Sequence, residues 1–366
     1  MEPALHAEMR ELRFARTERQ VGGVYFEGTR EDVWRANLWL RTAVRVLERV
    51  ARFQSADEDS LYAGAREVAW EELLSPGGTL AVTAHARDSQ LFHTGFLAQL
   101  VKDAIVDRIR DRTGARPSVD KDDPELGVRV HLVRDRCTLL LDTTGPSLHK
   151  RGWRRYQGRA PLAETLAASI LVLSGWDRRS PLIDPFCGSG TFLVEAASLA
   201  AGRAPGALRE RFAFERWPRH DAKRFAREQA DARAERPLPK KLQLVGSDHD
   251  PERLEGAREN LAAAGFADAV HLQQQDAADF RPRPGWNGWI VTNPPYGERI
   301  GDASSLRPLY ASFGQRLASD AAGYHLALLT STGMLADALG LNDLERVRVR
   351  NGALECELVV GELRFR

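Results

Sequence analysis

Cysteine is scarce in this sequence. Its 366 residues include three cysteines, Cys137, Cys187 and Cys356, which are far apart and have no C-x-x-C spacing. Zinc sites and redox motifs use closely spaced cysteine pairs, and small disulfide-stabilised domains use many more cysteines. We therefore expect free thiols and a reducing, cytoplasmic location. We also expect no metal, because no cluster of histidine, cysteine and acidic residues has ligand spacing.

Long hydrophobic runs and a large net charge are also absent. No apolar stretch approaches the roughly 20 residues that span a membrane, and the charged N-terminal segment has no signal-peptide core. The 52 Lys and Arg against 51 Asp and Glu leave a net charge of +1, so a polyanion would have to meet local basic patches. With 43% hydrophobic residues, the chain can form the cores of two or three domains, and we expect no membrane partner.

Two common nucleotide-binding motifs are missing from the glycine-rich stretch Asp184-Pro-Phe-Cys-Gly-Ser-Gly-Thr191. Its glycine spacing differs from the dinucleotide motif G-x-G-x-x-G, and it lacks the lysine of a P-loop, which disfavours a triphosphate site. Residues 181–183 predict a strand before the turn, and a helix is expected from the turn to about Ala201. Such a turn lets backbone N–H groups approach a ligand, and the helix N-terminus favours a carboxylate.

The stretch Thr292-Asn-Pro-Pro-Tyr-Gly297 follows an apolar run, 289–291, which predicts a buried strand. The two prolines lack an N–H and have a fixed φ, so they hold Asn293 and Tyr296 on a stiff bend. The Asn293 side-chain oxygen and the Pro294 carbonyl could accept both hydrogens of an exocyclic amine, while Tyr296 stacks on its ring. Methylation of such an amine suits this bend. A proline-rich turn without a function is the alternative.

Two further predicted strands also end in an acidic residue, Asp248 and Asp276. A carboxylate after the second strand of such an array suits a ribose diol, and Asp276 could accept a hydrogen bond from an adenine amine. Any one of these aspartates could be only a helix cap or turn former. Asp184, Asp248, Asp276 and Asn293 at successive strand ends together favour a shared ligand site at one edge of a parallel sheet.

The front half of the chain predicts a small α+β module. We expect a strand and turn over 21–28, a helix capped by Asp32 that runs to about Val50, a helix over 59–72, a strand over 79–86, a helix over 95–113, and strands over 128–133 and 137–143.

The back half alternates strands and helices and ends in a hairpin. We expect a helix over about 306–322, a strand over 324–330, and two strands over 345–350 and 354–363. The dipeptide Asn351-Gly352 between the last two is the strongest hairpin signal. The predicted fold class is therefore α/β, a parallel sheet closed by a C-terminal antiparallel hairpin and preceded by an α+β region.

Two segments are strongly basic. Residues 148–159 hold five Lys or Arg, two aromatic residues and no acid, a mixture that suits a stacked, charged polymer. An exposed inter-domain linker is a second interpretation, compatible with the first. Residues 203–241 hold 12 Lys or Arg against 6 acidic residues, as either a solvated helical insertion or a surface facing nucleic acid would.

The motifs above resemble those of a known family. Asp184–Thr191, Asp248, Asp276-Ala277 and Asn293–Tyr296 resemble motifs of class I (Rossmann-like) S-adenosylmethionine-dependent methyltransferases that act on exocyclic amines. The front half is similar to a THUMP RNA-binding module behind a ferredoxin-like subdomain. Residues 116–124, 139–154 and 158–164 carry that similarity. The chain looks most like the RlmL type, which methylates the 2-amino group of a guanine in 23S ribosomal RNA.

The resemblance implies a division of the chain. Residues 1–55 would form the ferredoxin-like subdomain, 56–147 the THUMP domain, 148–160 a basic linker, and 161–366 the methyltransferase domain with the insertion at 203–241. Relative to the family, we expect the strand and helix before Glu11 to be shortened or missing. The second methyltransferase domain of fused members is not expected.

The resemblance also implies roles for individual residues. Those that would bind S-adenosylmethionine are Pro161, Leu162, Asp184, Phe186, Cys187, Gly188, Ser189, Gly190, Thr191, Asp248, His249, Asp276, Ala277 and Asn293. The catalytic residues would be Asn293, Pro294, Pro295 and Tyr296. The residues expected to bind RNA are Lys150, Arg151, Trp153, Arg154, Arg155, Tyr156 and Arg159.

Several functions remain open at this point. The first is a monomeric enzyme that methylates a guanine of ribosomal RNA, and the second is the same reaction on transfer RNA. DNA adenine and protein glutamine methyltransferases use a similar bend, although the basic front half disfavours them. A ribosome-assembly RNA-binding protein without catalysis is disfavoured by the intact bend and glycine turn.

Overall fold

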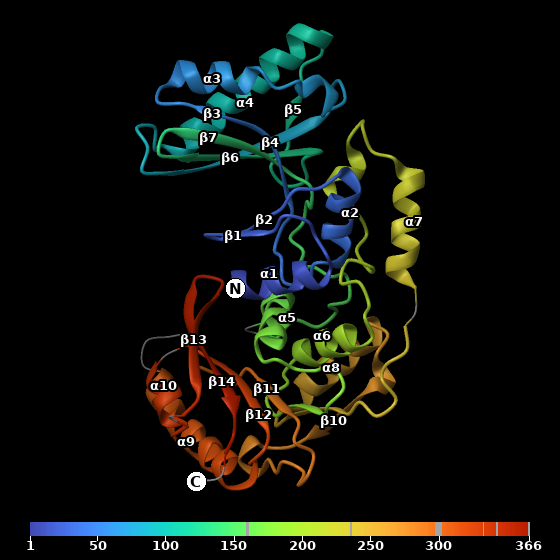
Figure 1. The fold of residues 1–366 in the computed structure, drawn as a ribbon, viewed down its shortest axis with the longest axis vertical. Coiled ribbons are helices and arrows are strands. Elements are labelled where there is room, and N and C mark those ends of the chain that lie inside the picture. Colours follow the sequence, from blue (N-terminus) through green and yellow to red (C-terminus); the bar gives the residue numbers. More distant parts are fainter. Residues whose placement is uncertain (159–160, 235, 297–301, 332, 342, 365–366) are drawn as a thin grey trace.

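The computed structural model describes residues 1–158, 161–234, 236–296, 302–331, 333–341 and 343–364. Its strands form a two-stranded, a five-stranded and a seven-stranded sheet. Figure 1 shows the two larger sheets at opposite ends of the molecule, with the small pair β1 (Glu18–Gln20) and β2 (Gly23–Tyr25) between them.

The seven-stranded sheet has the order β10-β9-β8-β11-β12-β14-β13. Its strands are β8 (Leu182–Asp184), β9 (Leu244–Asp248), β10 (Val270–Gln274), β11 (Trp289–Thr292), β12 (His325–Thr330), β13 (Glu345–Asn351) and β14 (Leu354–Glu362). The first five are parallel, and β14 and β13 form the predicted antiparallel hairpin. The strand order reverses between β8 and β11, the location where open α/β sheets bind ligands. The predicted α/β class is confirmed.

Helices cover both faces of this sheet. They are α5 (Glu164–Leu173), α6 (Thr191–Ala200), α8 (Pro251–Ala263), α9 (Asp302–Asp320) and α10 (Gly333–Ala338), with the short 3₁₀ helices η3 (Ala267–Ala269) and η4 (Ala277–Asp279). α5 and α6 are buried on nearly all sides, because the front half of the chain packs over them. Helices that are apolar all round are typical of such an interior position.

The five-stranded sheet of the front half has the order β3-β7-β6-β4-β5. Its strands are β3 (Leu47–Gln54), β4 (Thr79–Arg87), β5 (Ser118–Val119), β6 (Leu126–Val133) and β7 (Arg136–Asp142). The helices α3 (Glu58–Arg66) and α4 (Thr94–Thr113) cover one face (Figure 1). Along β6 buried and half-buried residues alternate, the pattern of a strand with one covered face.

The predicted helix from Asp32 to about Val50 is wrong in its second half. Thr29, not Asp32, is the N-cap of α2 (Arg30–Trp39), and the two residues form a capping box. The chain turns after Trp39, and residues from Leu47 pair with β7. The three-residue spacing of Val44, Leu47 and Val50 is typical of an amphipathic helix, but pairing with the distant strand β7 determines the observed conformation. The predicted helix over 59–72 likewise divides into α3 and the 3₁₀ helix η1 (Trp70–Glu72).

The N-terminal residues form a helix, α1 (Glu2–Glu11), where a shortened or missing element was expected. It packs on α5 and contributes Glu8, which is buried. The Glu8 carboxylate accepts hydrogen bonds from the backbone N–H groups of Arg41 and Thr42, over 2.9 and 3.0 Å, and it also faces the Arg41 guanidinium. α1 therefore fastens the turn after α2 to the back half of the molecule.

The basic segment 203–241 is largely buried over 204–217, whereas most residues from 221 onward are exposed, as expected for a solvated helical insertion. Phe212, Phe214, Trp217 and Phe225 join the core of the front half, where Trp34 of α2 lies against Phe214 and Phe225. The helix of this segment, α7 (Ala222–Arg233), packs on α2. The segment starts in the back half and completes the core of the front half.

Candidate active site at the strand ends

The ends of β8 and β11 meet through a hydrogen bond. Thr292 Oγ1 donates to Asp184 Oδ1 over 2.6 Å, and the Phe186 N–H donates to the same oxygen over 3.2 Å. Burial of Asp184 raises the pKa of its carboxyl to about 7, and the neighbouring Asp248 carboxylate adds to the rise. The predicted meeting of these two strand ends is therefore present.

The glycine turn after β8 has an open side. Gly188 and Gly190 have φ values of +51° and +78°, a conformation that residues with a Cβ rarely adopt. A Cβ on Gly190 would lie 3.2 Å from the Ala257 Cβ, whereas one on Gly188 would meet nothing within 4 Å. Gly190 is also the N-cap of α6, whose first N–H groups have no partner within the helix. The turn can thus receive an anionic or polar ligand at its backbone.

Asp248 fastens the turn to the end of β9. Its Oδ2 accepts from the Gly188 N–H and its Oδ1 accepts from the Asp250 N–H, each over 3.0 Å. The His249 ring lies 3.3 Å from Oδ1 and is mostly exposed. Asp248 is buried, and its Oδ2, with one donor, retains a second acceptor position, while Oδ1 faces both the Asp250 N–H and the exposed His249 ring. A diol that donates a hydrogen bond at the free position would match this carboxylate.

Asp276 lies at the next strand end and is exposed. Its Oδ1 accepts from the Ala278 N–H over 2.8 Å and caps the short helix η4, while Ala277 is buried. The carboxylate is therefore a helix cap with one oxygen left over. β10 pairs with β9 and so places this residue on the same edge of the sheet as Asp248.

Asn293 has a buried acceptor without a hydrogen-bond partner in the described part of the chain. Its Oδ1 is shielded from solvent and has no hydrogen-bond partner among the described residues. Leaving a buried acceptor unpaired costs roughly 1–3 kcal/mol, so such an atom in a ligand site is evidence for a missing donor. Pro294 is buried and Pro295 is exposed beside it. Gly297, the last residue of the predicted bend, lies outside the described residues.

Tyr296 is held from two sides. Its hydroxyl accepts from Asn351 Nδ2 over 2.7 Å, and its backbone carbonyl accepts from Ser331 Oγ over 3.2 Å. Asn351 is at the tip of the β13–β14 hairpin, so the C-terminal hairpin reaches back to the bend.

The basic linker differs from its prediction in the burial of two of its residues. Arg151 and Trp153 are 2% and 4% exposed, so neither offers its side chain to RNA. The reason is that Arg151 forms an ion pair with Glu195 of α6, with Nε 3.2 Å from Oε1, and also donates to the carbonyls of Leu148 and Arg41. Tyr156 is half-buried. Lys150 and Arg155 are exposed, and Arg159 lies outside the described residues.

A second buried arginine secures the same linker. Arg209 donates from Nη1 to the carbonyls of Ser147 and Lys150, over 2.9 and 2.6 Å, and from Nη2 to that of Pro146. Burial lowers the pKa of its guanidinium to about 10, which leaves it charged at neutral pH. We call Arg151 and Arg209 the linker clamp, because they hold 146–151 between the two halves of the molecule.

Arg154, predicted to contact RNA, reaches the glycine turn instead. Its Nε donates to Glu164 Oε1 over 2.8 Å, and its Nη2 donates to Thr191 Oγ1 over 3.0 Å and to the Leu162 carbonyl over 3.1 Å. Its Nη1 lies 3.3 Å from Ser189 Oγ. The guanidinium thus connects three parts of the predicted cofactor site, namely the start of α5, the turn and the start of α6.

The remaining predicted cofactor residues lie just before α5 and in the turn after β8. Pro161 is half-buried and Leu162 is buried just before α5. The Phe186 ring meets the Phe313 ring edge-on at 5.2 Å, and burial raises the pKa of the Cys187 thiol, which is therefore protonated. Cys187 fills space behind the turn and is no nucleophile.

Asn260 was not predicted to be part of the site, although its side chain connects the basic linker to the glycine turn. Its Oδ1 accepts from the N–H groups of Arg155 and Tyr156, over 2.7 and 3.0 Å, and its Nδ2 donates to the carbonyls of Tyr156 and Ser189, both over 3.0 Å. It is fully buried within α8. Asparagine is a poor residue for a helix interior, and that was the available signal.

Family comparison identifies the chain. A family described as RMKL-like, methyltransferase domain, matches residues 151–360. The chain belongs to the RMKL-like methyltransferase family. A THUMP domain matches residues 55–142, and an RlmL ferredoxin-like domain matches residues 1–47.

Individual relatives agree with this assignment. A protein of Syntrophotalea carbinolica named "Ribosomal RNA large subunit methyltransferase K/L" is 40% identical over 377 residues, which cover 100% of this chain and 53% of that protein. The chain therefore spans about half the length of the curated relatives it matches.

Solved structures share the whole fold. A putative methyltransferase in complex with SAH is 31% identical, with a TM-score of 0.85 and coverage of 100% of this chain and 95% of that one. A predicted N6-adenine-specific DNA methylase from Listeria monocytogenes is 31% identical, with a TM-score of 0.84 and coverage of 98% and 92%. The class I fold behind the two front modules is thus shared by structures of comparable length.

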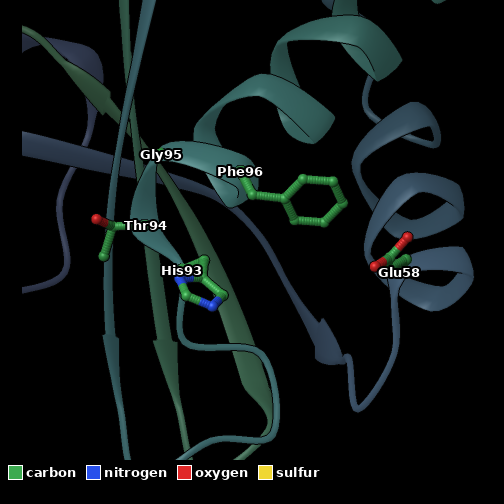
Figure 2. Close-up of a pocket in the computed structure, with 5 residues that line it drawn as sticks. All are labelled: Glu58, His93, Thr94, Gly95 and Phe96. Carbon is green, nitrogen blue, oxygen red and sulfur yellow. The ribbon is translucent and has the colours of Figure 1, made fainter.

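A separate hollow lies far from the strand ends. It has a volume of about 640 Å³, is open to solvent and is lined by Glu58, His93, Thr94, Gly95 and Phe96. Figure 2 shows Phe96 projecting from the first turn of α4 toward α3, while Thr94 points the other way. This hollow gathers one carboxylate and one imidazole but lacks the converging acceptors of the strand ends, so it is not the candidate active site.

Neither a metal site nor a membrane span is found among the described residues. They contain no group of three or more His, Cys, Asp or Glu that could hold a metal ion. None of their helices is both long enough and apolar enough to cross a membrane. All three cysteines are free and buried.

Proposed function

We propose that this chain transfers a methyl group from S-adenosylmethionine to the exocyclic 2-amino group of a guanine in large-subunit ribosomal RNA. The observation that carries the proposal is the buried Asn293 Oδ1 at the end of β11, which has no partner among the residues that the structure describes and lies beside the open glycine turn at the end of β8. A buried acceptor at this edge needs a donor from the substrate, and an amine supplies one.

The residues at the strand ends fit the cofactor. Bound S-adenosylmethionine supplies a methyl group already activated on a sulfonium. In our proposal Asp248 accepts from the ribose diol, and the first N–H groups of α6 receive the methionine carboxylate. Asp276 and the Ala277 N–H hold the adenine at the end of β10. Arg154 keeps the turn and the start of α6 in place.

The chain's own part in the chemistry is to orient the amine. An exocyclic amine is a poor nucleophile because its lone pair is delocalised into the ring. Asn293 Oδ1 and the Pro294 carbonyl accept its two hydrogens, which favours the tetrahedral nitrogen of the transition state. Tyr296 stacks on the base, which must leave its own stack to reach the site. The nitrogen becomes acidic only after methylation, and water can then take the proton.

The choice of RNA rests on the relatives and on the front half. Proteins about 40% identical over the whole chain are named ribosomal RNA large subunit methyltransferases K/L, although this chain covers only about half of each. In our proposal residues 1–147 bind RNA, 161–366 carry out the transfer, and the protein acts as a cytoplasmic monomer.

A second candidate is methylation of an adenine amine in DNA. It is favoured by the Listeria structure, which has 31% identity and the name of a predicted N6-adenine-specific DNA methylase. Asn293 and Tyr296 would serve either purine, because both bases carry an exocyclic amine on a planar ring.

The nature of the product separates these candidates. The purified chain would be incubated with methyl-labelled S-adenosylmethionine and, in parallel, with deproteinised large-subunit ribosomal RNA, transfer RNA and genomic DNA from a strain lacking the gene. We expect N2-methylguanosine in the ribosomal RNA by mass spectrometry of nucleosides. N6-methyladenine as the product, or transfer RNA as the only substrate, would contradict the proposal.

An Asn293→Ala variant is the internal control. It should cut the single-turnover rate about a hundredfold or more, as for the loss of a transition-state hydrogen bond, while cofactor affinity changes far less. Full activity in this variant would refute the role of Asn293.

A further inference from the structure

The five-stranded sheet has one covered face and one open face. Val130, Leu132, Cys137 and Leu139 are fully buried beneath α3 and α4. Side chains alternate along a strand, so the residues between these point to the other face. In Figure 1 the two helices lie above the sheet, and the other face is turned toward β1, β2 and the back half. An Arg49 contact to Tyr25 of β2 agrees with this orientation.

Strand register places the residues of the open face in three rows. Directly paired residues share a face, and the pairing of β3, β7, β6 and β4 is continuous. The rows are Arg49, Leu140, Arg129 and Thr83; Arg52, Thr138, His131 and His85; and Gln54, Arg136, Val133 and Arg87. These twelve positions hold five arginines and two histidines but no aspartate or glutamate, and the next row of the same face adds one acid, Asp142, opposite Leu47. The open face is therefore a concentrated basic surface on a chain of net charge +1.

The arginines of the open face differ from those on the helix side of the same module. On the helix side Arg108 pairs with Glu71 and Arg110 pairs with Asp107, each over 2.9 Å, and Arg66 pairs with Asp111.

On the open face, three exposed arginines, Arg49, Arg52 and Arg136, form no ion pair with an acidic residue in the described part of the chain. Of the other two, Arg129 shares the Asp142 carboxylate with Arg45, and Arg87 lies 3.5 Å from the exposed Asp88. The positive charge of Arg49, Arg52 and Arg136 is therefore available to bind an external polyanion.

We propose that this open face binds the sugar–phosphate backbone of the RNA substrate. The proposal rests on the proposed function for the polymer being RNA. Guanidinium groups suit phosphate because they present several N–H donors in one plane and stay charged at every physiological pH. A sheet face with rows of arginine can follow a backbone without reading its sequence. The face then supplies affinity and orientation, and the strand ends of the back half supply the chemistry.

The position of the face agrees with this division of labour. Along one side of the molecule in Figure 1, the open face is followed by β1–β2 and then by the β13–β14 hairpin. The tip of that hairpin carries Asn351, which contacts Tyr296 of the bend. RNA bound along this side would run from the arginine rows toward the candidate active site.

The test compares two pairs of arginines from the same module. The Arg52→Ala/Arg136→Ala variant removes two charges from the open face, and the matched control Arg66→Ala/Arg110→Ala removes two from the helix side. The probe is deproteinised large-subunit ribosomal RNA, and its dissociation constant is measured by filter binding over a series of salt concentrations. Unchanged thermal unfolding and cofactor affinity show that each variant is folded.

We expect the open-face pair to weaken RNA binding about tenfold. We also expect a salt dependence shallower by roughly 0.7 to 0.9 for each phosphate that the variant no longer neutralises, with the control pair close to the parent. Equal reductions in affinity in the two variants would overturn the proposal, because only total charge would then matter. The proposal would also be overturned if the open-face variant bound deproteinised RNA as tightly as the parent does. This holds even if the variant bound assembled ribosomal particles less tightly, because the partner of the face would then be a protein.

Methyl transfer is measured separately, so the two proposals can fail separately. If the parent methylates RNA but the open-face variant keeps its affinity and salt slope, the proposed surface is wrong and the proposed function stands. If the parent methylates none of the RNAs but the open-face variant alone loses RNA affinity, the function is wrong and the surface stands.

Discussion

The side-chain amide of Asn351 donates a hydrogen bond to the phenolic oxygen of Tyr296, over 2.7 Å. These residues are 55 positions apart, one at the tip of the C-terminal hairpin and the other on the proline bend. The antiparallel hairpin at the end of the sheet therefore orients the ring that we propose to stack on the target base. A hydroxyl occupied in this way has no need to take part in proton transfer.

Removing this hydrogen bond should have a mild effect. We expect Tyr296→Phe and Asn351→Ala each to lower the single-turnover rate a few-fold, because the ring remains but is held less firmly. Tyr296→Ala should be severe, since base stacking is worth roughly 1–3 kcal/mol. The double variant Tyr296→Phe/Asn351→Ala should be no slower than the worse single variant, because both remove one interaction. Additive losses would show that Asn351 acts on substrate in some other way.

Asp248 should be needed for cofactor affinity. Asp248→Ala removes the acceptor for the Gly188 N–H and, in our proposal, for the ribose. We expect the dissociation constant measured by calorimetry to rise at least tenfold, about 1.4 kcal/mol. Asp250→Ala is the matched control, because Asp250 is the N-cap of α8 and its loss should lower stability by about 1 kcal/mol without the same effect on affinity. Equal affinities in the parent and Asp248→Ala would remove this residue from the site.

Arg154 and Arg155 are neighbours with different surroundings. Arg154 fixes the glycine turn and Glu164, whereas Arg155 is exposed. We expect Arg154→Ala to weaken cofactor binding about tenfold, and Arg154→Lys to rescue it only in part, because lysine cannot reproduce the planar fork. Arg155→Ala should leave cofactor binding unchanged. Calorimetry on the three variants decides the matter, and equal cofactor affinities for the two alanine variants would contradict the assignment.

Asp184 should make stability depend on pH. Its folded-state pKa of about 7 lies above the ordinary value of 3.8, so the folded chain binds more protons than the unfolded chain between these values. The Asp184 contribution to stability is therefore fully present below about pH 4 and is lost as the pH rises through 7. Asp184→Asn mimics the protonated form, so its stability relative to the parent should increase from pH 4 to pH 7. Denaturant unfolding would give the free energy of unfolding of both proteins at each pH. A difference between them that stayed constant from pH 4 to pH 7 would refute the raised pKa.

The strand ends could be predicted because their signals are local. Asp184 is the last residue of its strand and Asn293 directly follows Thr292, the last residue of its strand, so the rule for parallel sheets brings them to one edge. The hairpin was equally accessible, because Asn351-Gly352 fixes its turn. That Asn293 Oδ1 is buried without a partner among the described residues could be learned only from coordinates, because it depends on the packing around a single atom.

Contacts between distant segments could not be predicted. Arg151 looked like part of an exposed basic stretch, but its partner Glu195 is 44 residues away within an apolar helix. Arg209 bonds backbone carbonyls 59 to 63 residues earlier, and a carbonyl leaves no trace in a sequence. The same limitation applies to β3, whose helical spacing was overruled by its pairing with β7.

The linker clamp has a consequence for the choice of substrate. With 146–151 immobilised by Arg151 and Arg209, the distance between the front sheet and the proline bend is built into the molecule rather than adjusted on contact. An RNA that contacts the front sheet and the proline bend at once must therefore hold its guanine at one fixed distance from the segment that binds the sheet. The folded shape of the RNA sets that distance. Consider two RNAs that have the same sequence around the guanine but a different number of base pairs between the guanine and the segment that binds the sheet. The protein would then discriminate between them by the length of that intervening segment alone.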